Sequence, residues 1–345
     1  MRSIVVQAFA VGLILASQAR AAPLEAKHVA TNAKWLAHVD VDAIRASNVV
    51  QKAWQNVLER LPDTESNLGF VRVVIGTDLT KDIHGITIYG KGIGKSEVVT
   101  IVAVSMDPAR LTLLASVIPG RETTSHGNYT IQNWTHMHGD HALTIAAAFR
   151  GHEQLVLASS IDDVKSALDV LDGKAPGLAA DARLGGNIPA GTTLLVRAEE
   201  IADTKLGKAP FTEPINSFRV VMGESEGQSF FRARMTMANP EAVAYTMTAI
   251  HGGQALSNLI CRDELGRKFV NAVQSKSDGQ SVTILWSVPA SDVWDGLVKI
   301  EEAVKKQITR LHGHDKHKTA DKEEGKAPVE QGVPVKKTVP PEEDF

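Results

Sequence analysis

The sequence lacks paired cysteines, an excess of basic residues and an apolar run long enough to span a membrane comfortably. It contains one cysteine, Cys261, so no intrachain disulfide can form and the hydrophobic core must carry stability even in an oxidising compartment. Lys and Arg number 37 against 40 Asp and Glu, which gives a net charge of -3. A mildly acidic, mixed surface gives no indication of a nucleic-acid partner. The N-terminal apolar run, residues 4–16, is too short to span a bilayer comfortably.

The N-terminus has instead the three parts of a secretory signal peptide. Arg2 supplies a positive first region, residues 4–16 supply the apolar region, and Ala19-Arg20-Ala21 forms an A-x-A cleavage signal. We therefore predict that residues 1–21 are removed after Ala21. The mature protein is then expected in the periplasm or outside the cell, with no transmembrane segment left.

The C-terminus differs in composition from the rest of the chain. From His312 onward it is rich in Lys, Glu and Pro and has almost no large apolar residues. Such a segment cannot bury enough surface to offset the entropy lost on ordering, which predicts a disordered tail over residues 312–345. About 290 residues remain between signal and tail, enough for one large or two moderate domains.

Strand and helix patterns alternate through this middle region and indicate an α+β fold. Short turns between strands favour largely antiparallel sheets with helices packed on one face. A helix is predicted after Ser47, with an apolar stripe that includes Val50, Trp54 and Val57. A second is predicted from Asp107-Pro108, with Val117 in its buried stripe.

The order of these patterns is repeated in the second half of the chain. A strand followed by Asn239-Pro240 and a helix corresponds to the strand, Asp107-Pro108 and helix of the first half. We therefore predict an internal duplication into two related α+β units, residues 22–180 and residues 181–311.

The residues 136–141 read HMHGDH and match H-x-H-x-D-H, the zinc motif of the metallo-β-lactamase fold. The resemblance implies that His136, His138 and His141 would bind zinc and that Asp140 would hold a second ion. Zinc would then lower the pKa of a bound water and make it a nucleophile for hydrolysis.

The surroundings of the motif favour a simpler interpretation. The fold would need a further His about sixty residues later, but after His152 the next histidine is His251. The corresponding stretch of the second half reads SDGQ, has no histidine and is typical of a turn between two strands. We therefore predict a β-hairpin that carries histidines, with no metal site, no catalytic residue and no cofactor.

Two further patterns carry little chemistry. GKGIGKS at residues 90–96 does not meet the spacing of a phosphate-binding loop, and it joins two strands, so no helix N-terminus faces a phosphate. No Ser, His and Asp occur with the signature of a nucleophile elbow.

Three stretches together resemble a family of uncharacterised exported bacterial proteins: LVLASSIDDVKSALDVLDGK, DIHGITIYG and DGQSVTILWSVPASDVWDGLVKI. The resemblance covers nearly the whole mature chain and implies a signal peptide, two related α+β halves and a variable tail. It implies no activity. The expected function is non-enzymatic binding or scaffolding in the cell envelope or periplasm, and the alternative is a zinc-dependent hydrolase that uses His136, His138, Asp140 and His141.

Overall fold

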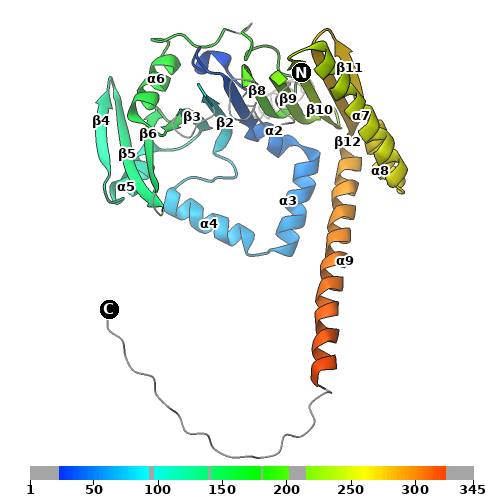
Figure 1. Cartoon of the computed structure of the whole chain (residues 1–345). Coiled ribbons are helices and arrows are strands. Elements are labelled where there is room, and N and C mark those ends of the chain that lie inside the picture. The colour runs from blue at the N-terminus through cyan, green and yellow to red at the C-terminus, as the bar shows by residue number, and fades with distance from the viewer. Residues whose placement is uncertain (1–22, 93–96, 139–140, 180–181, 202–214, 324–345) are drawn as a thin grey trace, which may run out of the picture. The chain divides into compact units, whose positions relative to one another are not determined.

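The computed structural model describes residues 23–92, 97–138, 141–179, 182–201 and 215–323 (Figure 1). The chain divides into two compact units, residues 1–296 and residues 297–345. The described strands all belong to the first unit. The second contains most of helix α9, Ala290–Glu323. Within the described part, no helix is both long and apolar enough to cross a membrane.

The first unit is built on one antiparallel sheet of twelve strands, which confirms the predicted α+β class. Their order across the sheet is β11-β12-β10-β9-β8-β1-β2-β3-β7-β6-β5-β4. The strands run, in chain order, β1 Trp35–Asp40, β2 Ile83–Gly90, β3 Val98–Val104, β4 Glu122–His126, β5 Tyr129–His138, β6 His141–Arg150, β7 Gln154–Ala158, β8 Thr192–Ala198, β9 Ile215–Ser225, β10 Gln228–Met237, β11 Gln274–Asp278 and β12 Ser281–Pro289.

The two halves of the chain meet at the centre of this sheet. Strand β1 pairs antiparallel with β8, so the sheets expected for the two halves are joined edge to edge into one. From this seam the order is β1-β2-β3 on one side and β8-β9-β10 on the other. Duplication and the boundary between residues 180 and 181 stay predictions.

The helices begin where the sequence places capping residues. Pro108 opens α5, Pro108–Ser116, after Asp107 accepts a hydrogen bond from the Ala109 N–H. Pro240 opens α7, Pro240–Ile260, after Asn239 accepts from the Ala242 N–H. Both predicted helix starts are confirmed. The other helices are α2 Val41–Ala46, α3 Asn48–Arg60, α4 Thr64–Ile75, α6 Ile161–Leu171 and α8 Glu264–Asn271, with a 3-10 turn, η1, at Ala26–His28.

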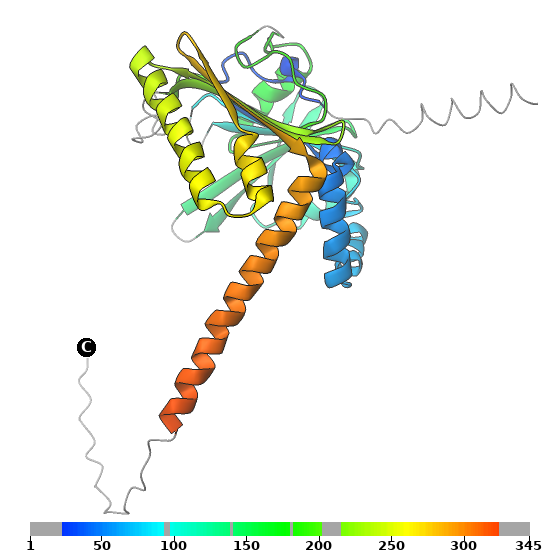
Figure 2. The ribbon, with the colours of Figure 1, turned by 90° about the vertical axis from the view of Figure 1, so that its right-hand side faces the viewer.

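Helices lie against both sides of the sheet in the first half, where one side was expected. On one side, called the α6 face, Leu36, Tyr89 and Val99 occupy paired positions and form the main core with Val164 and Leu168 of α6. Helix α5 lies over the outer strands on the opposite side, called the α5 face. In the second half, α7 packs with Met237 and Val282 in a smaller core, and α8 lies beside it (Figure 2). Strands β3 and β7 carry apolar side chains on both faces of the sheet, so other elements must pack on both faces to bury them.

Several apolar stripes on the helices are left uncovered. Trp54 of α3 is 42% exposed and Phe70 of α4 is 70% exposed. Val117, which the sequence placed in a buried stripe, is 77% exposed. An amphipathic pattern indicates an apolar face but does not say what covers it.

The C-terminal helix extends beyond the predicted start of the tail. Helix α9 continues through His312 to Glu323, and residues 324–345 lie outside the described part. Disorder of the tail therefore stays a prediction. The signal peptide also lies outside the described residues.

Candidate functional site

The backbone around the histidine motif has the predicted hairpin pairing. Strand β5 ends at His138 and β6 begins at His141, and these two residues are directly paired, as are His136 and Leu143. Residues 139 and 140, with Asp140 among them, and the side chains of the three histidines lie outside the described part. Among the remaining described residues, no group of three or more His, Cys, Asp or Glu is placed to hold a metal. Metal binding by the motif stays a question for experiment.

A serine, a histidine and an aspartate come together although no sequence motif predicts their grouping. His84 of β2 lies 3.0 Å through Nδ1 from Asp42 Oδ2 and 2.7 Å through Nε2 from Ser105 Oγ. Asp42 is buried on α2, and Ser105 directly follows β3. No sequence spacing connects residues 42, 84 and 105, so only the fold reveals this arrangement.

The surroundings of Ser105 do not complete a hydrolytic site. An acyl-transfer site needs N–H donors aimed at the developing oxyanion, often those of the nucleophile and its neighbour. Here the Ser105 N–H donates to the Asp82 carbonyl at 2.7 Å, and the Met106 N–H donates to the His152 carbonyl at 3.2 Å. Asp42 is also paired with Arg45. We interpret the group as a polar clamp that ties α2 to β2 and the end of β3.

An apolar cavity lies between α5 and the α5 face of the outer strands. Its volume is about 500 Å³, within the range of small-molecule sites. The lining is mostly apolar and aromatic, with Trp134, Phe149 and Leu157 along the sheet and Ala115 and Ile118 on the helix side. Because side chains alternate along a strand, these sheet residues point away from the main core and toward α5.

Part of the cavity lining is polar. Gln132 is 8% exposed, donates from Nε2 to Thr112 Oγ1 at 3.3 Å and accepts from Arg121 at 3.5 Å. Thr130 and Asn128 also line this cavity. Hydroxyl and amide groups of this kind orient a ligand through hydrogen bonds without adding charge.

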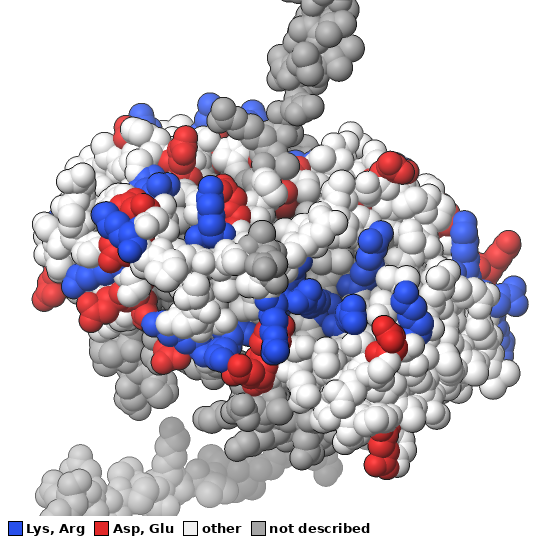
Figure 3. Space-filling model, turned by 90° about the horizontal axis from the view of Figure 1, so that it is seen from above, with Lys and Arg blue, Asp and Glu red and all other residues white. Residues whose placement is uncertain are grey.

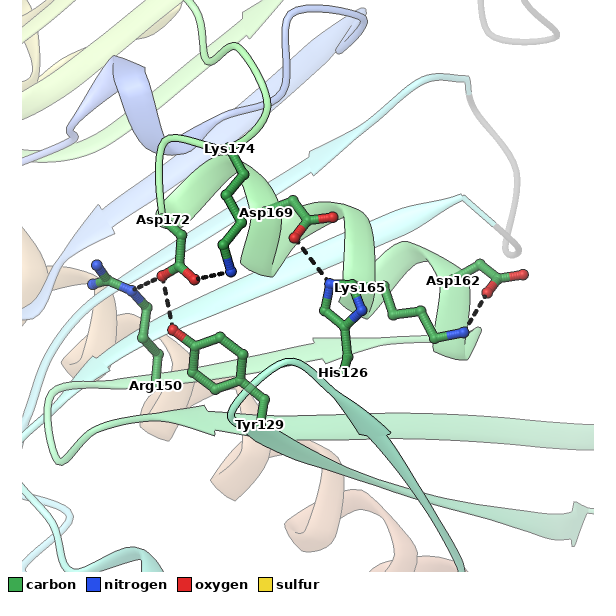
Figure 4. Close-up of polar contacts among 8 residues, drawn as sticks. All are labelled: His126, Tyr129, Arg150, Asp162, Lys165, Asp169, Asp172 and Lys174. Carbon is green, nitrogen blue, oxygen red and sulfur yellow. Dashed lines mark hydrogen bonds and ion pairs between the residues drawn. The ribbon is translucent and has the colours of Figure 1, made fainter.

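Among the described lining residues, only Tyr129 is titratable, and its hydroxyl is held by a polar cluster at the end of α6 (Figure 4). The Tyr129 hydroxyl donates to Asp172 at 2.7 Å, while Arg150 and Lys174 donate to the same carboxylate at 3.1 and 2.9 Å. Burial, with the adjacent Asp172, raises the pKa of Tyr129. The Tyr129 phenol is therefore held on the α6 side of the sheet, and the other described lining residues of the cavity are apolar or neutral and polar.

Comparison with known proteins assigns no family. No family model matches the chain, and no curated protein matches it. Solved structures with some likeness include crystal forms III and I of TP0453, with TM-scores of 0.42 and 0.41 and identities of 12% and 10%. These alignments cover 79% of this chain and 98% and 96% of the TP0453 chains. TM-scores below 0.5 are too low to define fold or function here.

Proposed function

We propose that the protein is an exported, non-enzymatic binding protein of the cell envelope or periplasm that holds a small apolar or amphipathic molecule between α5 and the sheet. The observation that carries this proposal is the roughly 500 Å³ cavity, whose described lining offers large apolar surface, a few neutral hydrogen-bonding groups and no described Asp, Glu, His, Lys or Arg side chain. Such a lining matches an acyl chain with a neutral or weakly polar end better than a charged metabolite.

The outer surface beside the cavity supports the same ligand class. Leu113 and Val117, on α5 and at its end, are 69% and 77% exposed, and Phe70 and Val73 on α4 are 70% and 76% exposed. Helices α4 and α5 contact each other. An apolar molecule that approaches the cavity along these helices would stay in contact with apolar surface, at a smaller desolvation cost than a path over charged residues.

Binding of the neutral fluorescent probe N-phenyl-1-naphthylamine, with the uncharged 1-dodecanol as competitor, tests the cavity directly. Ala115→Leu adds volume inside the cavity and should weaken probe binding tenfold or more. Ala109→Leu makes the same change on the same helix at an exposed position that does not line the cavity, and should leave binding unchanged. Equal affinity of both variants and the wild-type chain, or no binding by the wild-type chain, would rule out this site.

Export is tested separately. N-terminal sequencing of protein produced in a bacterial host with its full sequence should find Ala22 as the first residue, because an A-x-A signal directs cleavage after Ala21. A retained Met1 on most of the folded protein would contradict the proposal of export. It would not contradict the proposal that the cavity binds a ligand.

A further inference from the structure

Three arginines lie side by side across three neighbouring strands of the second half. Arg197 of β8 is directly opposite Arg219 of β9, and Arg219 is directly opposite Arg234 of β10. We call these residues the arginine row. Arg197 is also paired with Leu36, so the row lies on the α6 face. Adjacent strands are about 4.8 Å apart, and like charges at directly opposed positions destabilise a sheet.

No carboxylate among the described residues neutralises the row. Arg197 is 4% exposed, and its guanidinium donates to the backbone carbonyls of Leu184, Gly185 and Asn187, with Nε left without a partner. Arg219 donates to a backbone carbonyl, that of Arg183, and Arg234 donates to Ser281 Oγ at 3.3 Å. Within the described residues none of the three arginines forms an ion pair. Burial and the neighbouring Arg219 lower the pKa of Arg197 to about 10.

The exposed members of the row border a hollow. It has a volume of about 700 Å³ and is lined by Arg183, Arg219 and Arg234 together with neutral polar residues such as Asn216 and Ser217. Seen from above, this side of the molecule carries Lys and Arg side chains gathered along a hollow (Figure 3).

Two glutamates also border the hollow, but each has a cationic neighbour. Glu200 is paired with Lys34 at 2.5 Å, and Glu199 lies 3.9 Å from Arg183. Positive charge therefore remains in excess, since Arg197, Arg219 and Arg234 have no acidic partner among the described residues. A guanidinium presents a planar fork of N–H donors that matches the oxygens of phosphate and carboxylate groups.

We propose that this hollow is a binding site for a small soluble ligand that carries two or more oxyanion groups, such as a diphosphate or a di- or tricarboxylate. The ligand's oxygens would bind between Arg219 and Arg234, while the buried Arg197 adds charge from the neighbouring strand without contacting the ligand. The site lies on the α6 face, and it is separate from the apolar cavity on the α5 face and does not depend on the function proposed above.

Isothermal titration of the full chain with pyrophosphate and with citrate tests the site, with acetate as a singly charged comparison. Pyrophosphate or citrate should bind at least tenfold more tightly than acetate, and affinity should fall as salt rises. Arg219→Gln and Arg234→Gln should each weaken binding tenfold or more. Arg232→Gln is the matched control, because Arg232 lies on the same strand, 5.4 Å from the centre of the Phe230 ring, and does not line this hollow.

Thermal unfolding gives a second reading. Without ligand, Arg219→Gln should raise the melting temperature, because it removes a like charge from the middle of the row. With pyrophosphate the wild-type chain should gain stability and the variant should not. Failure of both pyrophosphate and citrate to bind the wild-type chain, or an equal loss of binding in Arg232→Gln, would overturn the proposal.

Discussion

At the scale of single residues, Asp172 shows how strongly local donors can hold a carboxylate. Hydrogen bonds from Tyr129, Lys174 and Arg150 lower its pKa from 3.8 to about 2. The carboxylate connects β5 and β6 to the end of α6, so its ionised form stabilises the fold (Figure 4). Because the folded pKa is depressed, this contribution is complete above the ordinary pKa and is lost as the pH falls toward 2.

The change Asp172→Asn should therefore reduce the free energy of unfolding above pH 5 and matter less with acidification. Urea unfolding of both proteins between pH 7 and pH 2 measures this, and the two curves should converge as the pH approaches 2. Asp162→Asn is the control, because Asp162 is 90% exposed and paired only with Lys165 among the described contacts. A difference for Asp172→Asn that stays constant down to pH 2 would contradict the prediction.

The double change His136→Ala and His138→Ala should leave the free energy of unfolding within about 1 kcal/mol of the wild-type value, because the predicted hairpin needs no metal for its stability. The two positions share a side of β5 because side chains alternate along a strand, but two imidazoles alone hold a metal weakly. Purified protein should contain well under one zinc per chain, and EDTA should not shift its melting. Stoichiometric zinc that disappears with the two histidines would favour the hydrolase.

Residue patterns in the sequence predicted local geometry better than long-range groupings. The turn-like HGDH stretch predicted that β5 and β6 would pair, and the backbone register agrees. Nothing in the sequence joined Asp42, His84 and Ser105, or the three arginines of the row, because each group depends on the register of strands distant in the chain. The residues that line the cavity could not be predicted either, because their grouping depends on which face of the sheet α5 covers.

At the scale of elements, the starts of helices could be predicted from the sequence, but the burial of their apolar faces could not. Asx-Pro pairs correctly marked the starts of α5 and α7 because the capping interaction is local. The stripe of α3 was also recognisable, yet Val50, Trp54 and Val57 remain 37% to 42% exposed. Periodicity reports which residues share a side of a helix, while burial depends on what the rest of the chain brings to that side.

Removal of the cap of α7 should have a measurable cost. Asn239 accepts a hydrogen bond from the Ala242 N–H at 2.8 Å, and Ala242 and Val243 in the first turn belong to the smaller core. Asn239→Ala should therefore lower the free energy of unfolding by about 1 kcal/mol, whereas Asn239→Asp keeps the cap and should lie within a few tenths of the wild-type value. Chemical denaturation of the three proteins checks this, and equal stability of all three would show that the cap is dispensable.

At the scale of the whole molecule, the antiparallel pairing of the strands could be predicted, but the joining of both halves into one sheet could not. Alternating patterns and short turns indicated antiparallel strands, and every described pair is antiparallel. That β1 would pair with β8 was not readable, because Trp35 and Ala198 are partners across more than 160 positions of sequence. If each half had formed its own sheet, the edge strands of the two sheets could have paired in other orders.

Truncation after Leu311 should leave the melting transition of the protein nearly unchanged. The removed residues 312–345 are rich in Lys, Glu and Pro and poor in large apolar residues, so they have little surface to bury on the folded body. Calorimetry of the full and shortened chains measures the effect. A loss of several degrees would show that the C-terminal segment stabilises the folded protein.

The two borders of the twelve-stranded sheet have a consequence for how the protein behaves at high concentration. Strands β4 and β11 form these borders, each is five residues long, and their sequences, ETTSH and QSKSD, contain no large apolar side chain. A sheet border is a template on which further chains can assemble into fibrils, and short polar borders that carry charge discourage such growth. The short, polar border strands therefore disfavour edge-to-edge assembly of this broad sheet at high protein concentration. This holds even though several helices carry exposed apolar side chains.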